Sequence, residues 1–211
     1  MYLWSRTATL QGPPAETMTW ASDMTELVNR TVEDEVTLWQ GVFGGPIGTL
    51  IWNTLIPSRA RLATNMMAIM GSEEYHQRMA EGQQYLSAVP TEDMLRKFVF
   101  GKPGERPPDV GAAVESVTAT PAPGHLMEAI EFGPHIAQIV ERVTGLTPSF
   151  YVDAYGTFGQ VTWFTVHSDF AAVDESQDKL MTSDEYMSAV ERGGTLFNAG
   201  SGQRGLATRI A

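Results

Sequence analysis

The feature that most constrains this chain is an internal repeat with a period of about 110 residues. The segment GSEEYHQRMAEG at 71–82 returns as TSDEYMSAVERG at 182–193. Four residue pairs match at one constant offset of 111 residues: Ser72 with Ser183, Glu74 with Glu185, Tyr75 with Tyr186, and Gly82 with Gly193. Periods of roughly 20–50 residues are typical of solenoids, so a period this long indicates two domain-sized units.

The offset also locates the boundary between the two units. From residue 48 onward it needs no gap, and Trp52 matches Trp163. In the first helical segment an offset of 112 matches better, so we expect one residue to be lost or gained in the loop that follows. The segment GKPGERPPDVG is rich in glycine, proline and charge, as exposed connectors are. We therefore predict a first unit at 1–101, a linker at 102–111 and a second unit at 112–211.

Each unit shows the same order of hydrophobic periods. Strand patterns occupy 2–10, 35–43, 47–56 and 93–100 in the first unit, and helical patterns occupy 13–32 and 58–86. The second unit has strand patterns at 112–120, 149–155, 158–167 and 205–210, and helical patterns at 125–145 and in the region that ends near Gly193. We expect Gly133-Pro134 to kink or restart its helix, and the run NMMAIM at 65–70 to pack into the core.

The order β-α-β-β-α-β is that of a ferredoxin-like unit, with four antiparallel strands and both helices on one face. The strands carry apolar residues on both faces: Leu50, Trp52 and Thr54 alternate with Ile51, Asn53 and Leu55. Both faces should therefore be buried, and the second sheet is the simplest cover for the first. The predicted fold class is α+β, with two tandem ferredoxin-like units whose antiparallel sheets pack as an intramolecular α/β barrel.

The composition excludes several classes of partner and site. Fourteen basic and 25 acidic residues give a formal net charge of −11, so we expect no nucleic acid and no membrane partner. The absence of cysteine excludes disulfides, thiolate metal sites and a cysteine nucleophile. The N-terminus lacks a signal-peptide pattern and no apolar run is long enough to span a bilayer, so we expect a cytoplasmic location.

With this order of elements, the chain resembles a tandem member of the dimeric α/β-barrel superfamily. The stretch GTLIWNTLIPSRARLATNMMAIMGSEEYHQRM is most similar to the NIPSNAP-type, antibiotic-biosynthesis-monooxygenase-like branch, and GQVTWFTVHSDFAAVDESQDKLMTSDEYMSAV keeps its strand and its DEY but lacks the paired arginines. The resemblance implies a ligand in the barrel interior. Members of the superfamily include cofactor-free monooxygenases and cyclases of aromatic polyketides, haem-binding enzymes, and proteins without established activity.

Residues that differ between the two units are the candidates for chemistry, because fusion lets the halves diverge. At an offset of 111, Val42 matches Asp153, Gln40 matches Tyr151 and Ile56 matches His167. If Asp153 and His167 face one cavity, an apolar pocket would disfavour their charged forms and could poise one as a general base. The alternative is that both lie at strand ends in solvent.

Other strand residues could bind a ligand or stabilise an anion. The predicted ligand-binding residues are Trp4, Trp39, Trp52, Tyr151 and Trp163, whose rings offer flat apolar area; core packing is the alternative. Arginine or asparagine side chains in an apolar cavity could bind an enolate or phenolate oxygen, and such residues in predicted strands are Arg6, Asn53, Arg96 and Arg209. We take Arg6, Asn53 and Arg209 as the anion partners, with a solvent-facing role as the alternative.

No pattern predicts a metal site. The histidines lack the spacing of ligand pairs on one helix: His76, His125, His135 and His167. We predict binding of a small aromatic or polyketide-like molecule, with cofactor-free oxygenation or cyclisation as the chemistry. The alternatives are haem binding through a single axial histidine, and a non-catalytic structural or interaction protein. Sheet edges could still join two chains, so a homodimer is left open.

Overall fold

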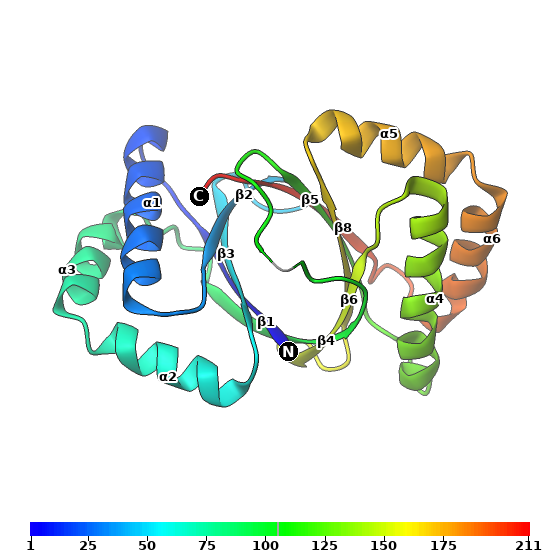
Figure 1. The fold of residues 1–211 in the computed structure, drawn as a ribbon, viewed down its shortest axis with the longest axis horizontal. Coiled ribbons are helices and arrows are strands. Elements are labelled where there is room, and N and C mark those ends of the chain that lie inside the picture. The colour runs from blue at the N-terminus through cyan, green and yellow to red at the C-terminus, as the bar shows by residue number, and fades with distance from the viewer. Residues whose placement is uncertain (105) are drawn as a thin grey trace.

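The computed structural model describes residues 1–104 and 106–211, and it shows a central barrel between two groups of helices (Figure 1). The strands are β1 (Tyr2–Thr9), β2 (Thr37–Phe43), β3 (Thr49–Ile56), β4 (Glu92–Phe100), β5 (Ala113–Ala119), β6 (Ser149–Tyr155), β7 (Val161–His167) and β8 (Gln203–Arg209). The α-helices are α1 (Pro14–Thr31), α2 (Arg59–Met70), α3 (Glu73–Gly82), α4 (Leu126–Thr144), α5 (Phe170–Met181) and α6 (Asp184–Gly193). Helices α1–α3 cover one side of the barrel and α4–α6 cover the opposite side.

The eight strands close into one antiparallel barrel in the order β1-β3-β2-β8-β5-β7-β6-β4. Each half contributes four neighbouring strands, and the halves join along two seams, β2 with β8 and β4 with β6. This arrangement confirms the predicted α+β fold with an intramolecular barrel. That the segments 1–101 and 112–211 are separate folding units stays a prediction.

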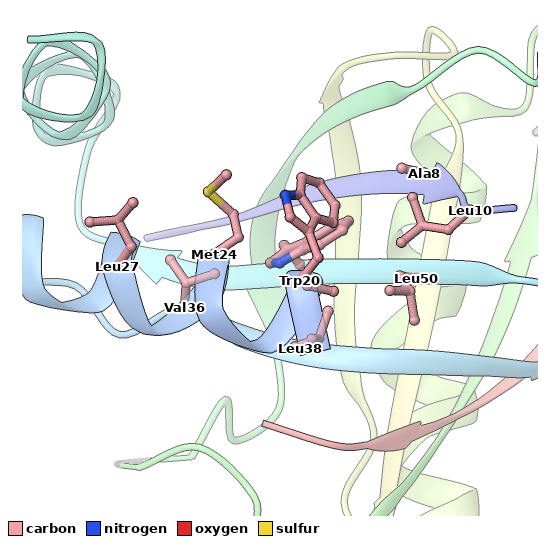
Figure 2. Close-up of a cluster of buried hydrophobic side chains, with 10 residues drawn as sticks. Ala8, Leu10, Trp20, Met24, Leu27, Val36, Leu38 and Leu50 are labelled. Atoms are coloured by element: carbon pink, nitrogen blue, oxygen red, sulfur yellow. The ribbon is translucent and has the colours of Figure 1, made fainter. Parts of the chain in front are cut away.

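The outward face of the barrel forms two apolar cores with the helices. In the first half, Trp20, Met24 and Leu27 of α1 pack over the sheet with Leu38 and Leu50 (Figure 2). The second core contains Ile136, Ile139, Phe150, Val161 and Trp163. Burial of each large apolar side chain stabilises the fold by roughly 1.5–3 kcal/mol, so these two cores hold the helices against the barrel.

The repeated EEY and DEY segments preserve how each third helix docks. The hydroxyls of Ser72 and Ser183 cap the two helices by accepting from the backbone amides of Tyr75 and Tyr186. The following acidic residues form equivalent ion pairs: Glu74 with Arg30, and Glu185 with Arg142. The matched glycines allow close contact with an aromatic ring: Gly82 with Trp20, and Gly193 with Phe132. The repeat is therefore explained by packing.

Strand pairing corrects the alignment of the two halves. Leu38 lies opposite Trp52, and Phe150 lies opposite Trp163, so β2 matches β6 at an offset of 112. Trp39 therefore corresponds to Tyr151. The predicted matches of Gln40 with Tyr151 and Val42 with Asp153 are wrong by one residue, because the offset returns to 111 only at β3; Asp153 corresponds to Gly41.

Two local predictions also need correction. Helix α4 continues through Pro134 without a restart, because Ile136, Ile139 and Val140 bury its apolar face. The methionine run does not pack into the core: Met67 is 77% exposed, and only Asn65 of α2 is buried. The buried Asn65 amide donates to Asp34 at 2.8 Å, which turns the methionine face outward. No helix within 1–104 or 106–211 is long and apolar enough to cross a membrane.

Candidate functional site

The barrel interior contains a cavity of about 860 Å³. Side chains alternate between the two faces of a strand, so every second residue points inward. The inward-facing wall is partly apolar, with Trp39, Ile51 and Phe164, and partly polar, with Ser5 and Asn53. Ligand pockets in proteins commonly measure roughly 300–1,000 Å³, so this interior has the size of a site for a small molecule.

The described residues between β4 and β5, 101–104 and 106–112, lie across one end of the barrel (Figure 1). Pro103, Gly104 and Pro107 from this segment line the cavity. Arg209 at the end of β8 fastens it, because its guanidinium donates to the Pro108 carbonyl and its own carbonyl accepts from the Gly111 amide at 2.9 Å. The connector thus narrows the entrance to the interior.

A buried ion pair lies in the wall where β4 meets β6. Arg96 and Asp153 are directly opposed residues of these strands, and Nε of Arg96 lies 3.2 Å from Oδ1 of Asp153. Their side chains are 7% and 1% exposed. Nη1 of Arg96 donates to the Ser5 hydroxyl at 3.1 Å, and the guanidinium lies over the Phe164 ring at 5.5 Å.

The hydrogen bonding of this pair is incomplete. Within the described part of the chain, Nε of Arg96 and both carboxylate oxygens of Asp153 lack an aligned hydrogen-bond partner. Oδ1 of Asn53, which also lines the cavity, lacks one too. Buried polar groups in proteins nearly always have hydrogen-bond partners. A cluster of such groups without partners beside a cavity is typical of a ligand-binding site.

Burial sets the protonation behaviour of these groups. It raises the pKa of Asp153 to about 6, although the positive charge of the nearby Arg96 acts in the opposite direction. Burial also raises the pKa of Tyr151, which lines the cavity on the same strand as Asp153. It lowers the pKa of Arg96, against the effect of Asp153, yet a guanidinium keeps its charge at neutral pH. The cavity wall therefore presents one fixed cation, and the carboxyl group of Asp153 behind it has a pKa of about 6.

The second seam of the barrel has no such pair. At the equivalent place on β2 and β8, Gly41 lies opposite Ala207. Both residues line the cavity, as does Gly205. The interior is therefore asymmetric, with charged side chains on the β4–β6 wall and small residues on the β2–β8 wall. The small residues leave space for the bulk of a ligand.

Three of the predicted site residues line this cavity. They are Asn53, Trp39 and Tyr151. Asp153 lies behind Arg96, with both carboxylate oxygens buried away from the open space. The predicted pairing of Asp153 with an inward-facing His167 does not occur, because His167 belongs to the other face of its strand.

His167 lies under the helices of the second half. Its side chain is fully buried, neither ring nitrogen has a hydrogen-bond partner among the described residues, and burial lowers its pKa. Nε2 lies 3.9 Å from Oε2 of Glu115, which is itself held by Arg204 and Gln177. This polar cluster is separated from the cavity by the sheet.

The remaining predicted residues point away from the cavity. Arg6 forms a bidentate ion pair with Asp93 on the outer face at 2.7 Å, and Arg209 bonds to Glu35 and the connector at the barrel rim. Trp4 packs on the first apolar core. The indole of Trp52 donates to the Thr25 hydroxyl, and that of Trp163 donates to the Gly133 carbonyl. These tryptophans hold helices to the sheet.

The cavity residues do not fit haem with an axial histidine. His76 lies in α3, His135 lies in α4, and His125 directly precedes α4, so these three belong to the helical layers. His167 is buried on the outer face of the sheet. Within residues 1–104 and 106–211, no group of three or more potential metal-binding side chains comes together. An axial histidine for haem is therefore not available in the interior among the described residues.

Comparison with solved structures places this barrel among known folds. No model of a known protein family matches the chain, and no curated protein matches it in sequence. A proposed monooxygenase from Fusobacterium nucleatum aligns over 100% of this chain and 92% of its own, with a TM-score of 0.73 and 8% identity. An anthrone oxidase-like protein aligns over 100% and 91%, with a TM-score of 0.69 and 14% identity.

This chain has the dimeric α/β-barrel fold. A heme-binding protein from Thermus thermophilus also shares it, covering 100% of this chain and 91% of its own, with a TM-score of 0.54 and 10% identity. At such identities the α/β-barrel likeness concerns the fold alone. Assignment to the NIPSNAP-type or antibiotic-biosynthesis-monooxygenase-like branch stays a prediction.

Proposed function

We propose that the barrel binds a small aromatic or polyketide-like molecule with an ionisable oxygen, and that it catalyses cofactor-free oxygenation or ring closure of this molecule. The observation that carries the proposal is the cavity of about 860 Å³ with the buried Arg96 guanidinium in its wall. Trp4, Trp52 and Trp163 point outward, so these large rings leave the interior open. This argues against the alternative of a barrel filled by its own side chains.

The chemistry needs an anion to form in the cavity. Loss of a proton from a CH₂ group that is conjugated through aromatic rings to a carbonyl, as in anthrone, gives an enolate-type anion. Arg96 would bind its oxygen, with Asn53 as a second polar contact. The carbanion adds to O₂, the peroxide takes the proton back, and loss of water leaves a ketone. CH₂ plus O₂ thus become C=O plus H₂O. In a cyclisation, the same carbanion would attack a carbonyl of its own chain.

Asp153 is the candidate for the group that finally holds the proton. Neither of its oxygens lines the cavity, so the proton would have to reach it through a bridging water molecule. The Asp153 pKa of about 6 matches a base that works near neutral pH. It lies next to Arg96, so the charge of the guanidinium remains compensated when the proton moves. His167 lies on the far side of the sheet, and we assign it no part in the reaction.

Anthrone is a suitable test substrate, because its CH₂ group lies between two rings; an anthrone oxidase-like protein has the same fold. We expect the protein to bind anthrone and to speed its conversion to anthraquinone, followed by absorbance and by O₂ consumption. Arg96→Gln should abolish the acceleration. The matched control is Arg6→Gln, which removes an arginine from the outer face of β1. An unaccelerated reaction, or equal rates in Arg96→Gln and wild type, would refute the catalytic proposal.

Mass spectrometry of small molecules retained by protein from its native host tests the binding proposal without assuming a substrate. We expect a co-purified aromatic compound that Arg96→Gln no longer retains. A cytoplasmic location and a homodimer stay predictions.

A further inference from the structure

The cavity wall holds one buried cation, Arg96, and one buried carboxylate, Asp153, whose charges cancel. This charge balance limits the charge that a ligand can bring into the site. We propose that the acidic oxygen of the ligand replaces Asp153 as the counter-ion of Arg96, and that Asp153 takes up one proton in the exchange. The inference rests on the proposed function, because it concerns the same cavity. It adds the class of ligand: a weak acid that arrives neutral.

The geometry places Arg96 between Asp153 and the open space. Arg96 lines the cavity, whereas neither oxygen of Asp153 reaches it. Nε of Arg96 faces Asp153 at 3.2 Å, and Nη1 is held by Ser5 at 3.1 Å. A ligand oxygen that approaches the guanidinium from the cavity therefore meets a cation that already has a partner.

Two anions cannot share this one guanidinium at low cost. Repulsion between neighbouring buried carboxylates strongly raises the pKa of one of them. In the free protein the pKa of Asp153 is already raised to about 6, so it is the group that accepts the proton when a second anion arrives. The ligand gains the ion pair, and Asp153 becomes a neutral acid.

No side chain described next to Arg96 and Asp153 competes with Asp153 for the proton. The neighbouring side chains are Ser5 from β1, Met94 from β4 and Phe164 from β7, and none of them titrates. Tyr151 on β6 faces Arg96, and burial raises its pKa, so it stays protonated. The other charged groups that line the cavity come from its rims: Glu33, Asp34, Glu35, Glu92, Arg106 and the amino group of Met1, whose pKa is lowered by burial and by Lys97.

The exchange predicts which ligands the site favours. A phenol, an enol or an anthrone brings its own proton, which passes to Asp153, so binding takes no proton from solution. A permanent carboxylate must take one from solution, and its affinity should fall about tenfold for each pH unit above the pKa of Asp153. Near neutral pH the site therefore selects neutral weak acids over carboxylates of the same shape.

The test uses 1-naphthol and 1-naphthoate, which share one ring system. Calorimetric titrations at pH 7.5 in phosphate and in Tris give the number of protons bound per complex, because the two buffers differ in ionisation enthalpy. We expect naphthoate to take up about one proton and naphthol none. Naphthoate affinity should fall about tenfold per pH unit between pH 6.5 and 8.

Asp153→Asn should abolish the proton uptake with naphthoate and make its affinity independent of pH over this range. Asp93→Asn is the matched control, because it removes the carboxylate that pairs with Arg6 on the outer face of the barrel; it should behave as wild type. If Asp153→Asn fails to fold, the uptake by the wild-type protein decides. Naphthoate binding without proton uptake would overturn the exchange but leave the proposed function standing. Binding of neither probe would overturn both.

Discussion

Asp153 should make the free protein less stable as the pH rises, and Asp153→Asn should remove this effect. The pKa of Asp153 is about 6 in the folded protein against an ordinary value of 3.8. A carboxyl with a raised folded pKa contributes stability that is fully present below the unfolded pKa and is lost as the pH rises through the folded pKa. The shift corresponds to roughly 3 kcal/mol in total, at about 1.36 kcal/mol per pKa unit.

The usable window lies between pH 5 and 7.5, where other carboxyl groups have largely finished titrating. From pH 5 to 7.5, the free energy of unfolding of the wild-type protein should decrease by roughly 1.4 kcal/mol more than that of the Asp153→Asn variant. Urea unfolding followed by tryptophan fluorescence at several pH values measures the difference. Asp93→Asn should show less than about 1 kcal/mol of change, because exposed ion pairs contribute little. A wild-type to Asp153→Asn difference that stays constant with pH would refute the reasoning.

Three further predictions concern packing and the cavity. Gly193→Ala should lower the free energy of unfolding by about 1–3 kcal/mol, because the added Cβ would lie 2.3 Å from the Phe132 ring. Gly194→Ala is the control, because its Cβ would meet nothing within 4 Å; it should be neutral or slightly stabilising in the same urea assay. Met67→Lys should change stability by less than about 0.5 kcal/mol, because the side chain is 77% exposed; a larger loss would mean that α2 packs differently. Ala207→Leu should weaken 1-naphthol binding about tenfold by calorimetry without lowering stability, and unchanged affinity would show that the ligand avoids the β2–β8 wall.

The sequence was sufficient for the architecture because the relevant signals are local and occur twice. Alternating apolar residues mark each strand, and the matched EEY and DEY segments mark equivalent helices. Apolar residues on both faces of β3 and β7 correctly indicated that both sides of the sheet are covered. The closed barrel follows from these patterns.

The same patterns could not say which strand face lines the cavity. Because both faces are apolar, Trp52 and Trp163 resembled cavity walls, yet they anchor α1 and α4. The Arg96–Asp153 pair could not be predicted from the sequence for another reason. It forms across the β4–β6 seam between the two halves, so neither strand alone shows that the two residues meet. Arg96 was recognised only as one of several strand arginines.

Fusion of the two halves gives the interior a direction. If two identical subunits formed such a barrel, both seams would carry the same residues, and a ligand could enter in either of two equivalent poses. Here the buried Arg96–Asp153 pair lies in the β4–β6 seam, while Gly41 and Ala207 occupy the equivalent place in the β2–β8 seam. A ligand should therefore bind in one orientation, with one ligand molecule per polypeptide. Because its two ends then meet different residues, a reaction should occur at one end only.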